Sequence, residues 1–163
     1  MIRELGRPGD LGWVIQAHGE LYAAEYGFDT RFEALVAQIV ASYAAGHDPA
    51  REKAWIAEVD GARAGCVFCV DAGKADPGED DTAVLRLLLV TPAARGLGLG
   101  GALVDTCLSF ARAAGYKRIR LWTTDPLVAA RHIYLSRGFK LVDSAPHDGF
   151  GVALVGQTYA SDL

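Results

Sequence analysis

The sequence predicts a single domain of the α/β (α+β) class, built on one mixed β-sheet with helices packed against it. Three observations lead to this class. Strand-like runs alternate with helix-like stretches; residues 84–90 (VLRLLLV) are almost continuously aliphatic; and this run leads through a glycine-rich turn into an amphipathic helix. With 163 residues, of which 51% are hydrophobic and 22% charged, the chain can bury one sizeable core.

The first part of the chain is predicted to hold a short edge strand followed by two helices. The strand spans residues 2–5, and Asp10 is a typical N-cap for a helix that ends at Gly27. The second helix follows a cap at residues 29–30 and ends near Gly46. Its apolar residues recur at helical spacing and form an inward stripe of Phe32, Leu35, Val36, Ile39, Val40 and Tyr43.

The sheet is predicted to continue with a hairpin, the aliphatic strand and three further strands. Residues 53–59 and 64–70 are joined by Asp60-Gly61, a favoured two-residue turn, and a solvated acidic loop follows at residues 71–81. Because residues 84–90 are so apolar, we expect a central strand covered on both faces. The remaining elements are a helix from Gly98 to Gly115, a strand at residues 118–123, a helix at residues 127–137, and a hairpin of residues 139–142 and 150–158 around Pro146, Asp148 and Gly149.

The turn between the aliphatic strand and its helix is the first candidate site. Its glycines let the backbone approach an anion closely, and the first amides of the following helix have no partner within that helix. Such a helix start favours a phosphate, and an arginine adds positive charge. The residues of this predicted phosphate-binding loop are Arg95, Gly96, Leu97, Gly98, Leu99, Gly100 and Gly101.

Two patterns fit this loop. Gly96, Gly98 and Gly101 satisfy the dinucleotide fingerprint G-x-G-x-x-G, whereas Arg95, Gly98 and Gly100 satisfy the acyl-coenzyme A pattern R-x-x-G-x-G. A dinucleotide loop follows its strand almost at once and opens a long series of βαβ units. Here a proline-containing segment intervenes and little chain remains, so the acyl-coenzyme A pattern is favoured.

Residues 88–92 (LLVTP), 95–100 (RGLGLG) and 130–139 (ARHIYLSRGF) together resemble the GNAT superfamily of acyl-CoA N-acyltransferases. Residues 18–27 (HGELYAAEYG) and 155–158 (VGQT) also resemble acetyltransferase domains fused behind MarR-type regulators in bacteria, although we expect no winged-helix half in this chain. The resemblance implies a mixed, mostly antiparallel sheet of about six to seven strands flanked by about four helices, with its central strands splayed apart.

The same resemblance implies acetyl-CoA as cosubstrate, with the loop on its diphosphate. Backbone groups of Leu88, Leu89 and Val90 would pair with the pantetheine arm and donate an N–H to the thioester carbonyl. The family often carries an asparagine seven residues before its motif tyrosine, where it contacts the pantetheine. This sequence has Leu127 there, so the lower part of the coenzyme site departs from the family pattern.

Tyr134 is the candidate catalytic residue. By its place in residues 130–139 it matches the family tyrosine that faces the coenzyme sulfur. A phenol with a pKa near 10 stays protonated at neutral pH and can donate to the departing thiolate. The alternative is an ordinary helix tyrosine that packs on the sheet with its hydroxyl in water.

The acceptor amine needs a base, because deprotonating a lysine side chain at pH 7 costs about 4.6 kcal/mol. Candidates on the first predicted helix are Glu20, Glu25 or a water held by Tyr22 or Tyr26, although each also fits an amphipathic helix surface. Arg86 interrupts the aliphatic strand, either to bind an acidic substrate group or to form a buried ion pair.

Charge and cysteine usage argue against other classes. The net charge of −4 comes with no basic run, so no nucleic-acid partner is expected, and the absence of a signal or membrane-length apolar stretch predicts a cytoplasmic protein. Cys66 and Cys69 form a C-x-x-C within a strand-like run, where residues three apart face opposite sides. They are predicted to be core residues, and no metal is expected.

The sequence therefore predicts a GNAT-like N-acetyltransferase that transfers acetyl from acetyl-CoA directly to an amine of a small molecule or peptide. A ping-pong route through a cysteine is disfavoured because all three cysteines are predicted to be buried. The alternatives are a non-catalytic acyl-CoA-binding or sensor module and a nucleotide-binding domain. Dimers are common among the relatives, so a homodimer is also compatible with the resemblance.

Overall fold

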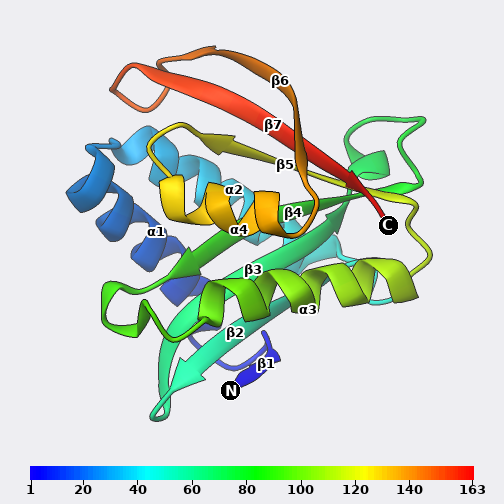
Figure 1. Ribbon diagram of the computed structural model, residues 1–163. Coiled ribbons are helices and arrows are strands. Elements are labelled where there is room, and N and C mark those ends of the chain that lie inside the picture. The colour runs from blue at the N-terminus through cyan, green and yellow to red at the C-terminus, as the bar shows by residue number, and fades with distance from the viewer.

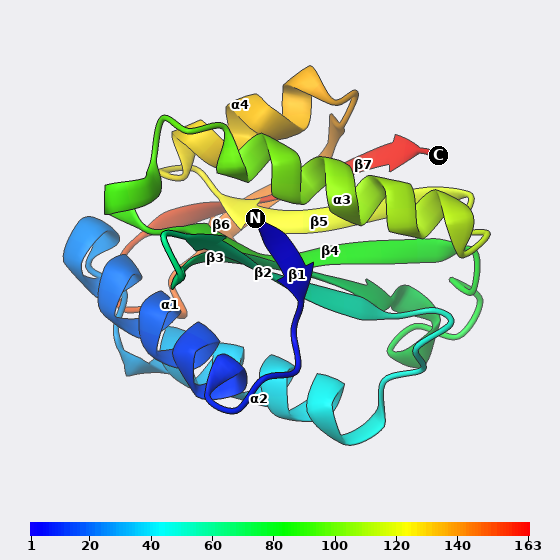
Figure 2. The ribbon, with the colours of Figure 1, turned by 90° about the horizontal axis from the view of Figure 1, so that it is seen from below.

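The computed structural model describes all 163 residues and contains one seven-stranded sheet with two helices on each face (Figures 1 and 2). The strands lie in the order β1-β2-β3-β4-β5-β7-β6, and only β4 and β5 run parallel. The strands are β1 (Ile2–Glu4), β2 (Lys53–Val59), β3 (Ala62–Asp71), β4 (Thr82–Val90), β5 (Arg118–Thr124), β6 (Lys140–His147) and β7 (Leu154–Asp162). The helices are α1 (Asp10–Tyr26), α2 (Thr30–Gly46), α3 (Leu99–Ala113) and α4 (Val128–Ser136), with short 3-10 turns at Ala72–Lys74 and Pro92–Ala94.

Two apolar cores lie on opposite faces of the sheet, one under α3 and α4 and the other under α1 and α2. Cys69 belongs to the first core and Cys66 to the second, and both thiols are free and buried. The prediction that the C-x-x-C is split between two faces is therefore confirmed. The mixed, mostly antiparallel sheet and its four helices are confirmed as well.

The sheet opens between β4 and β5. These strands pair only where Thr82–Val84 meets Arg118–Arg120, and beyond that point they diverge. Within the open half of β4, Leu87 has a positive φ of 56° and the register with β3 shifts. Arg86 is exposed there, and Leu88 is only half-buried. The expectation that residues 84–90 are covered on both faces is thus wrong for the second half, because β5 no longer lies beside it and only β3 still pairs with it.

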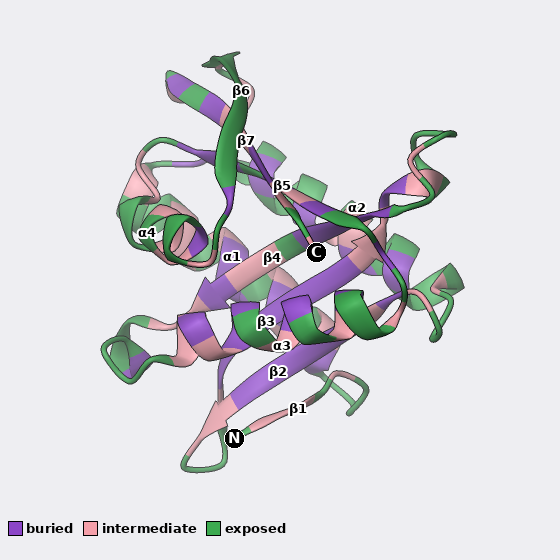
Figure 3. Cartoon of the chain, turned by 45° about the vertical axis from the view of Figure 1, so that its right-hand side comes forward, coloured by how far each residue is buried: buried purple, intermediate pink, exposed green.

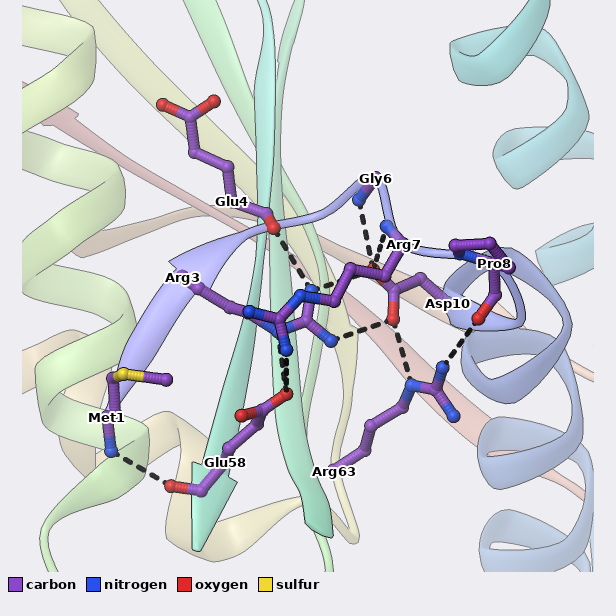
Figure 4. A network of polar contacts seen from close by, with 9 residues as sticks. All are labelled: Met1, Arg3, Glu4, Gly6, Arg7, Pro8, Asp10, Glu58 and Arg63. Atoms are coloured by element: carbon purple, nitrogen blue, oxygen red, sulfur yellow. Dashed lines mark hydrogen bonds and ion pairs between the residues drawn. The ribbon is translucent and has the colours of Figure 1, made fainter. Parts of the chain in front are cut away.

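Asp10 does not cap α1. It is the first helical residue, and its side chain is 0% exposed beneath the N-terminal strand (Figure 4). Its carboxylate accepts hydrogen bonds from Arg3 (Nη1, 2.8 Å) and Arg63 (Nε, 2.8 Å), and from the backbone N–H groups of Gly6 (3.0 Å) and Arg7 (2.9 Å). The predicted N-cap is wrong because these donors bind the carboxylate from outside the helix, tying β1 and β3 to α1.

The last hairpin is longer than predicted. β6 extends to His147 and β7 begins at Leu154, so Pro146 lies in a strand, paired with Val155, and not in the turn. β6 is an edge strand, exposed along most of its length (Figure 3), and there a residue without an N–H costs no sheet hydrogen bond. The predicted Asp60-Gly61 turn is confirmed, with φ of 52° and 78° at its two residues.

None of the helices has both the length and the apolar character that crossing a membrane requires.

Candidate functional site

Two cavities meet where β4 leaves β5. The Arg86 cavity, of about 450 Å³, lies among α1, α2, β4 and β5. The loop cavity, of about 460 Å³, lies among β4, the glycine-rich loop and α4. Tyr22, Leu88 and Leu127 line both cavities, and the Tyr22 hydroxyl lies 3.5 Å from the Leu88 carbonyl oxygen. These three residues form the junction of the two adjacent cavities, where a ligand in either one would contact the same side chains.

The loop cavity gathers most of the residues predicted to bind the coenzyme: Leu88, Leu89, Val90, Arg95, Gly96, Gly98, Leu99, Gly100 and Gly101. Leu97 is the exception, because its side chain is 63% exposed and lies outside the cavity. No backbone N–H from Gly96 to Gly101 donates to a main-chain oxygen; the first to do so is Ala102, to Gly98. Six successive free amides at a helix start form a site for an anion.

The loop glycines have two different structural roles. Gly96 and Gly98 have positive φ values of 82° and 77°, and a Cβ on either would meet open space. They shape the loop so that its amides turn outward. A Cβ on Gly100 would lie 2.7 Å from Ile133 Cδ1, and one on Gly101 would lie 2.5 Å from Nη2 of Arg137, the residue that follows α4. These two glycines allow α3 to approach α4.

Arg95 and Glu25 form an ion pair at the rim of the loop cavity, with Nη2 and Oε1 2.5 Å apart. Glu25 lines neither cavity, and Glu20 lies outside them too, where it accepts a hydrogen bond from Gln16. Neither carboxylate is among the residues that line the two cavities, and each is paired with a side chain of the protein.

Tyr134 is 5% exposed, lines the Arg86 cavity and packs against Phe139 at 5.8 Å between ring centroids. Burial raises the pKa of its phenol well above the ordinary value, so the hydroxyl is protonated at neutral pH. The residue belongs to the core and lines the Arg86 cavity but not the loop cavity, which differs from the alternative of a side chain with its hydroxyl in bulk water.

His18 is a cavity residue that sequence reasoning missed. It is 1% exposed, lines the Arg86 cavity and packs against Tyr22, one helical turn later, in a tilted arrangement with ring centroids 5.5 Å apart. Its Nδ1 lies 2.8 Å from the Val14 carbonyl oxygen, and its Nε2 has no partner. Burial lowers its pKa to about 4. The imidazole is therefore neutral, with the proton on Nδ1 and a free lone pair on Nε2. The sequence signal that could have identified His18 is its spacing of four residues from Tyr22, which places both side chains on one face of α1.

Arg86 lines its cavity without an ion-pair partner. Although the residue is partly exposed, the loss of water around its guanidinium within the cavity lowers its pKa, and the neighbouring Arg120 lowers it further. Arg120 itself is paired with Asp76 at 2.7 Å. Two interpretations of Arg86 were open, a buried ion pair or a contact with an acidic substrate group. The structure provides no carboxylate for the ion pair.

Residues 15–139 match the sequence profile of the acetyltransferase (GNAT) family. The chain belongs to this family. Its fold is also that of solved family structures. A ribosomal-protein-alanine N-acetyltransferase from Brucella melitensis has 17% identity and a TM-score of 0.79 over 100% of this chain and 99% of that chain. The structure of yncA from Salmonella typhimurium with its cofactor acetyl-CoA has 20% identity and a TM-score of 0.77 over 100% and 93%.

An N-acetyltransferase from Staphylococcus aureus Mu50 is similar to this GNAT acetyltransferase as well, with 19% identity and a TM-score of 0.77 over 99% of this chain and 97% of that chain. No curated protein matches the sequence. The dinucleotide-binding alternative is wrong for this fold, because that fingerprint belongs to a mostly parallel sheet and this GNAT sheet has a single parallel pair.

Proposed function

We propose that this GNAT acetyltransferase uses acetyl-CoA and transfers the acetyl group directly to a primary amine of a small molecule or peptide. The observation that carries the proposal is the junction of two cavities at the open end of β4, one of them lined by the glycine-rich loop whose six amides from Gly96 to Gly101 have no main-chain partner. Two cavities allow both substrates to be bound together. The three cysteines are buried, which argues against an acyl-cysteine intermediate.

The loop cavity fits the coenzyme. The amides of Gly96 to Gly101 would hold the diphosphate, with Arg95 supplying charge as it exchanges Glu25 for the ligand. Backbone groups of Leu88 to Val90 would hold the pantetheine. Leu127, which lines both cavities, offers that arm an apolar contact in place of the family's amide. When bound, acetyl-CoA supplies the acetyl group as a thioester.

The residues at the junction then have separate roles. A backbone N–H of the open half of β4 donates to the thioester oxygen and stabilises its developing charge. The amine nitrogen forms the new bond to the acetyl carbon as the bond from carbon to sulfur breaks. Tyr134 gives its phenolic proton to the departing sulfur, and the proton lost by the amine restores the phenol. The products are an N-acetylated amine and a free thiol.

Release of free thiol from acetyl-CoA in the presence of a mixed set of amines tests the proposal. We expect release that depends on both the protein and an amine. A non-catalytic sensor would bind coenzyme A and release no thiol, and that outcome would replace the proposal with the sensor alternative. The cytoplasmic location, the homodimer and the relation to MarR-fused domains stay predictions.

Gly98→Glu is expected to weaken binding of coenzyme A by about tenfold or more, because its carboxylate would project into the open space in front of the free amides. Gly98→Ala is the matched control, since it meets the same positive φ, with a strain of about 1–2 kcal/mol, without adding charge. Titration calorimetry with coenzyme A and with acetyl-pantetheine, which lacks the diphosphate, measures the difference. Equal affinities of both variants for coenzyme A would contradict the loop assignment.

A further inference from the structure

The Arg86 cavity carries one net positive charge. Its charged lining residues are Arg86, Arg120 and Asp76, and the last two pair with each other at 2.7 Å. His18 is neutral at pH 7. Arg86 is left without a counterion, and the Nε of Arg120 is buried without a partner. Cations such as polyamines are disfavoured in such a cavity, whereas an anionic group would satisfy both guanidinium groups.

The same cavity also contains a hydrogen-bond acceptor with nothing to accept. His18 Nε2 is buried and unpartnered, and its ring packs at a tilt against Tyr22 at the junction with the loop cavity. A buried acceptor that lacks a donor costs about 1–3 kcal/mol, so a ligand with an N–H at this place would recover that free energy. The cavity would therefore favour a ligand with an anionic group beside Arg86 and an N–H donor near the junction.

These two requirements lie close together. Arg86 precedes Leu88, which lies at the junction, by two residues on β4, so their Cα atoms are at most ~7 Å apart. Because Arg86, His18 and the junction residues line one cavity, a compact molecule that carries its amine and its anion a few bonds apart can reach both groups. A long chain with an amine at its far end would not place both groups correctly.

The walls of the cavity are apolar and closed on one side. Fifteen of its 22 lining residues are hydrophobic. The loop between β6 and β7 is fastened to the start of α2, because the backbone N–H of Asp29 donates to the Phe150 carbonyl at 2.9 Å. Phe150 also packs on Phe28 and Phe32, with ring centroids 5.2 Å and 5.1 Å apart. A small apolar side chain in this cavity would contact these aromatic rings.

We propose that the acceptor is a small zwitterionic amine of the α-amino acid class with an apolar side chain, whose carboxylate binds Arg86 and whose amine lies between His18 Nε2 and the junction. This inference rests on the proposed function, since it names the acceptor of the same reaction. The aromatic residues at the closed side of the cavity would contact the apolar side chain.

The test compares each of leucine, methionine and phenylalanine with its own amide as acceptor. Each pair has the same side chain and differs in the carboxylate. We expect kcat/KM to be about tenfold or more higher for the acids, although the amides have the less basic amines and are more often neutral. In Arg86→Gln, kcat/KM for the acids is expected to fall about 10–100-fold, with the amides changed less than about threefold.

Arg112→Gln is the matched control, because Arg112 is exposed on α3 and lines neither cavity. It should leave every ratio unchanged. Binding of coenzyme A, followed by calorimetry, should be equal in all three proteins and shows that Arg86→Gln has folded. Should that variant fail to fold, the acid-to-amide ratio of the unaltered protein still decides.

Four outcomes separate the possibilities. A wild-type preference for acids that Arg86→Gln removes supports the inference. Equal use of acids and amides, or an equal loss of both in Arg86→Gln, overturns it. If uncharged amines such as phenethylamine release thiol and the amino acids do not, the inference fails while the proposed function stands. If no amine releases thiol and coenzyme A still binds, the proposed function fails, and the inference with it.

Discussion

Replacing Tyr134 with phenylalanine is expected to lower kcat about 100-fold or more and to leave KM for acetyl-CoA little changed. The phenol is 5% exposed and borders the Arg86 cavity close to the junction, so the variant removes one hydroxyl from a packed ring without opening a void. Because burial holds the pKa of Tyr134 above its ordinary range, the phenol is a proton donor throughout the neutral range. The loss should therefore be similar from pH 6 to pH 9.

Tyr159→Phe is the control for this variant. Tyr159 is also buried in the core under α3 and α4, but it lies on β7 outside both cavities. Steady-state rates with saturating acetyl-CoA, at several pH values, give the comparison. If Tyr134→Phe turns over as fast as the Tyr159 control at every pH, the hydroxyl has no part in the transfer and the acid must be sought elsewhere.

Asp10→Asn is expected to lower the free energy of unfolding by about 3–5 kcal/mol, because it leaves buried arginine charge without its carboxylate. Arg3 and Arg63 converge on Asp10 from β1 and β3 (Figure 4), and the side chain is 0% exposed. Chemical denaturation measures the difference. Asp105→Asn is the control; its pair with Arg137 on the surface is worth under about 1 kcal/mol. If Asp10→Asn loses no more free energy of unfolding than Asp105→Asn, the buried network stabilises the fold no more than a surface ion pair does.

The Asp10 carboxylate is also expected to make the stability of the protein depend on pH in the acid range. Hydrogen bonding from Arg3 holds the pKa of Asp10 far below its usual range, although burial acts in the opposite direction. A depressed folded-state pKa contributes stability that is present above the unfolded value, about 3.9, and is lost as pH falls toward the folded value. The parent protein should therefore lose stability below about pH 4, and Asp10→Asn should lose less over that interval.

The order of the elements and the glycine-rich loop could be predicted because their signals are local. The Asp60-Gly61 turn, the glycines that end helices and the spacing of apolar residues each depend on neighbours within a few positions. Asp10 shows where this fails. As a polar residue before an apolar helix it has the pattern of an N-cap, yet its partner Arg63 comes from β3 and outcompetes the helix amides.

The sequence by itself determined the family, the fold class and the loop that would bind the coenzyme, because these depend on contiguous motifs and on residue periodicity. Only the tertiary structure decided which side chains share a cavity. His18 and Arg86 come from α1 and β4, and they meet because β4 parts from β5 beneath α1 and α2. Glu25, on the same helix as His18, is turned to Arg95 instead. No local sequence pattern encodes which residues of α1 line the cavity and which do not, since this results from the packing of two layers against an open sheet.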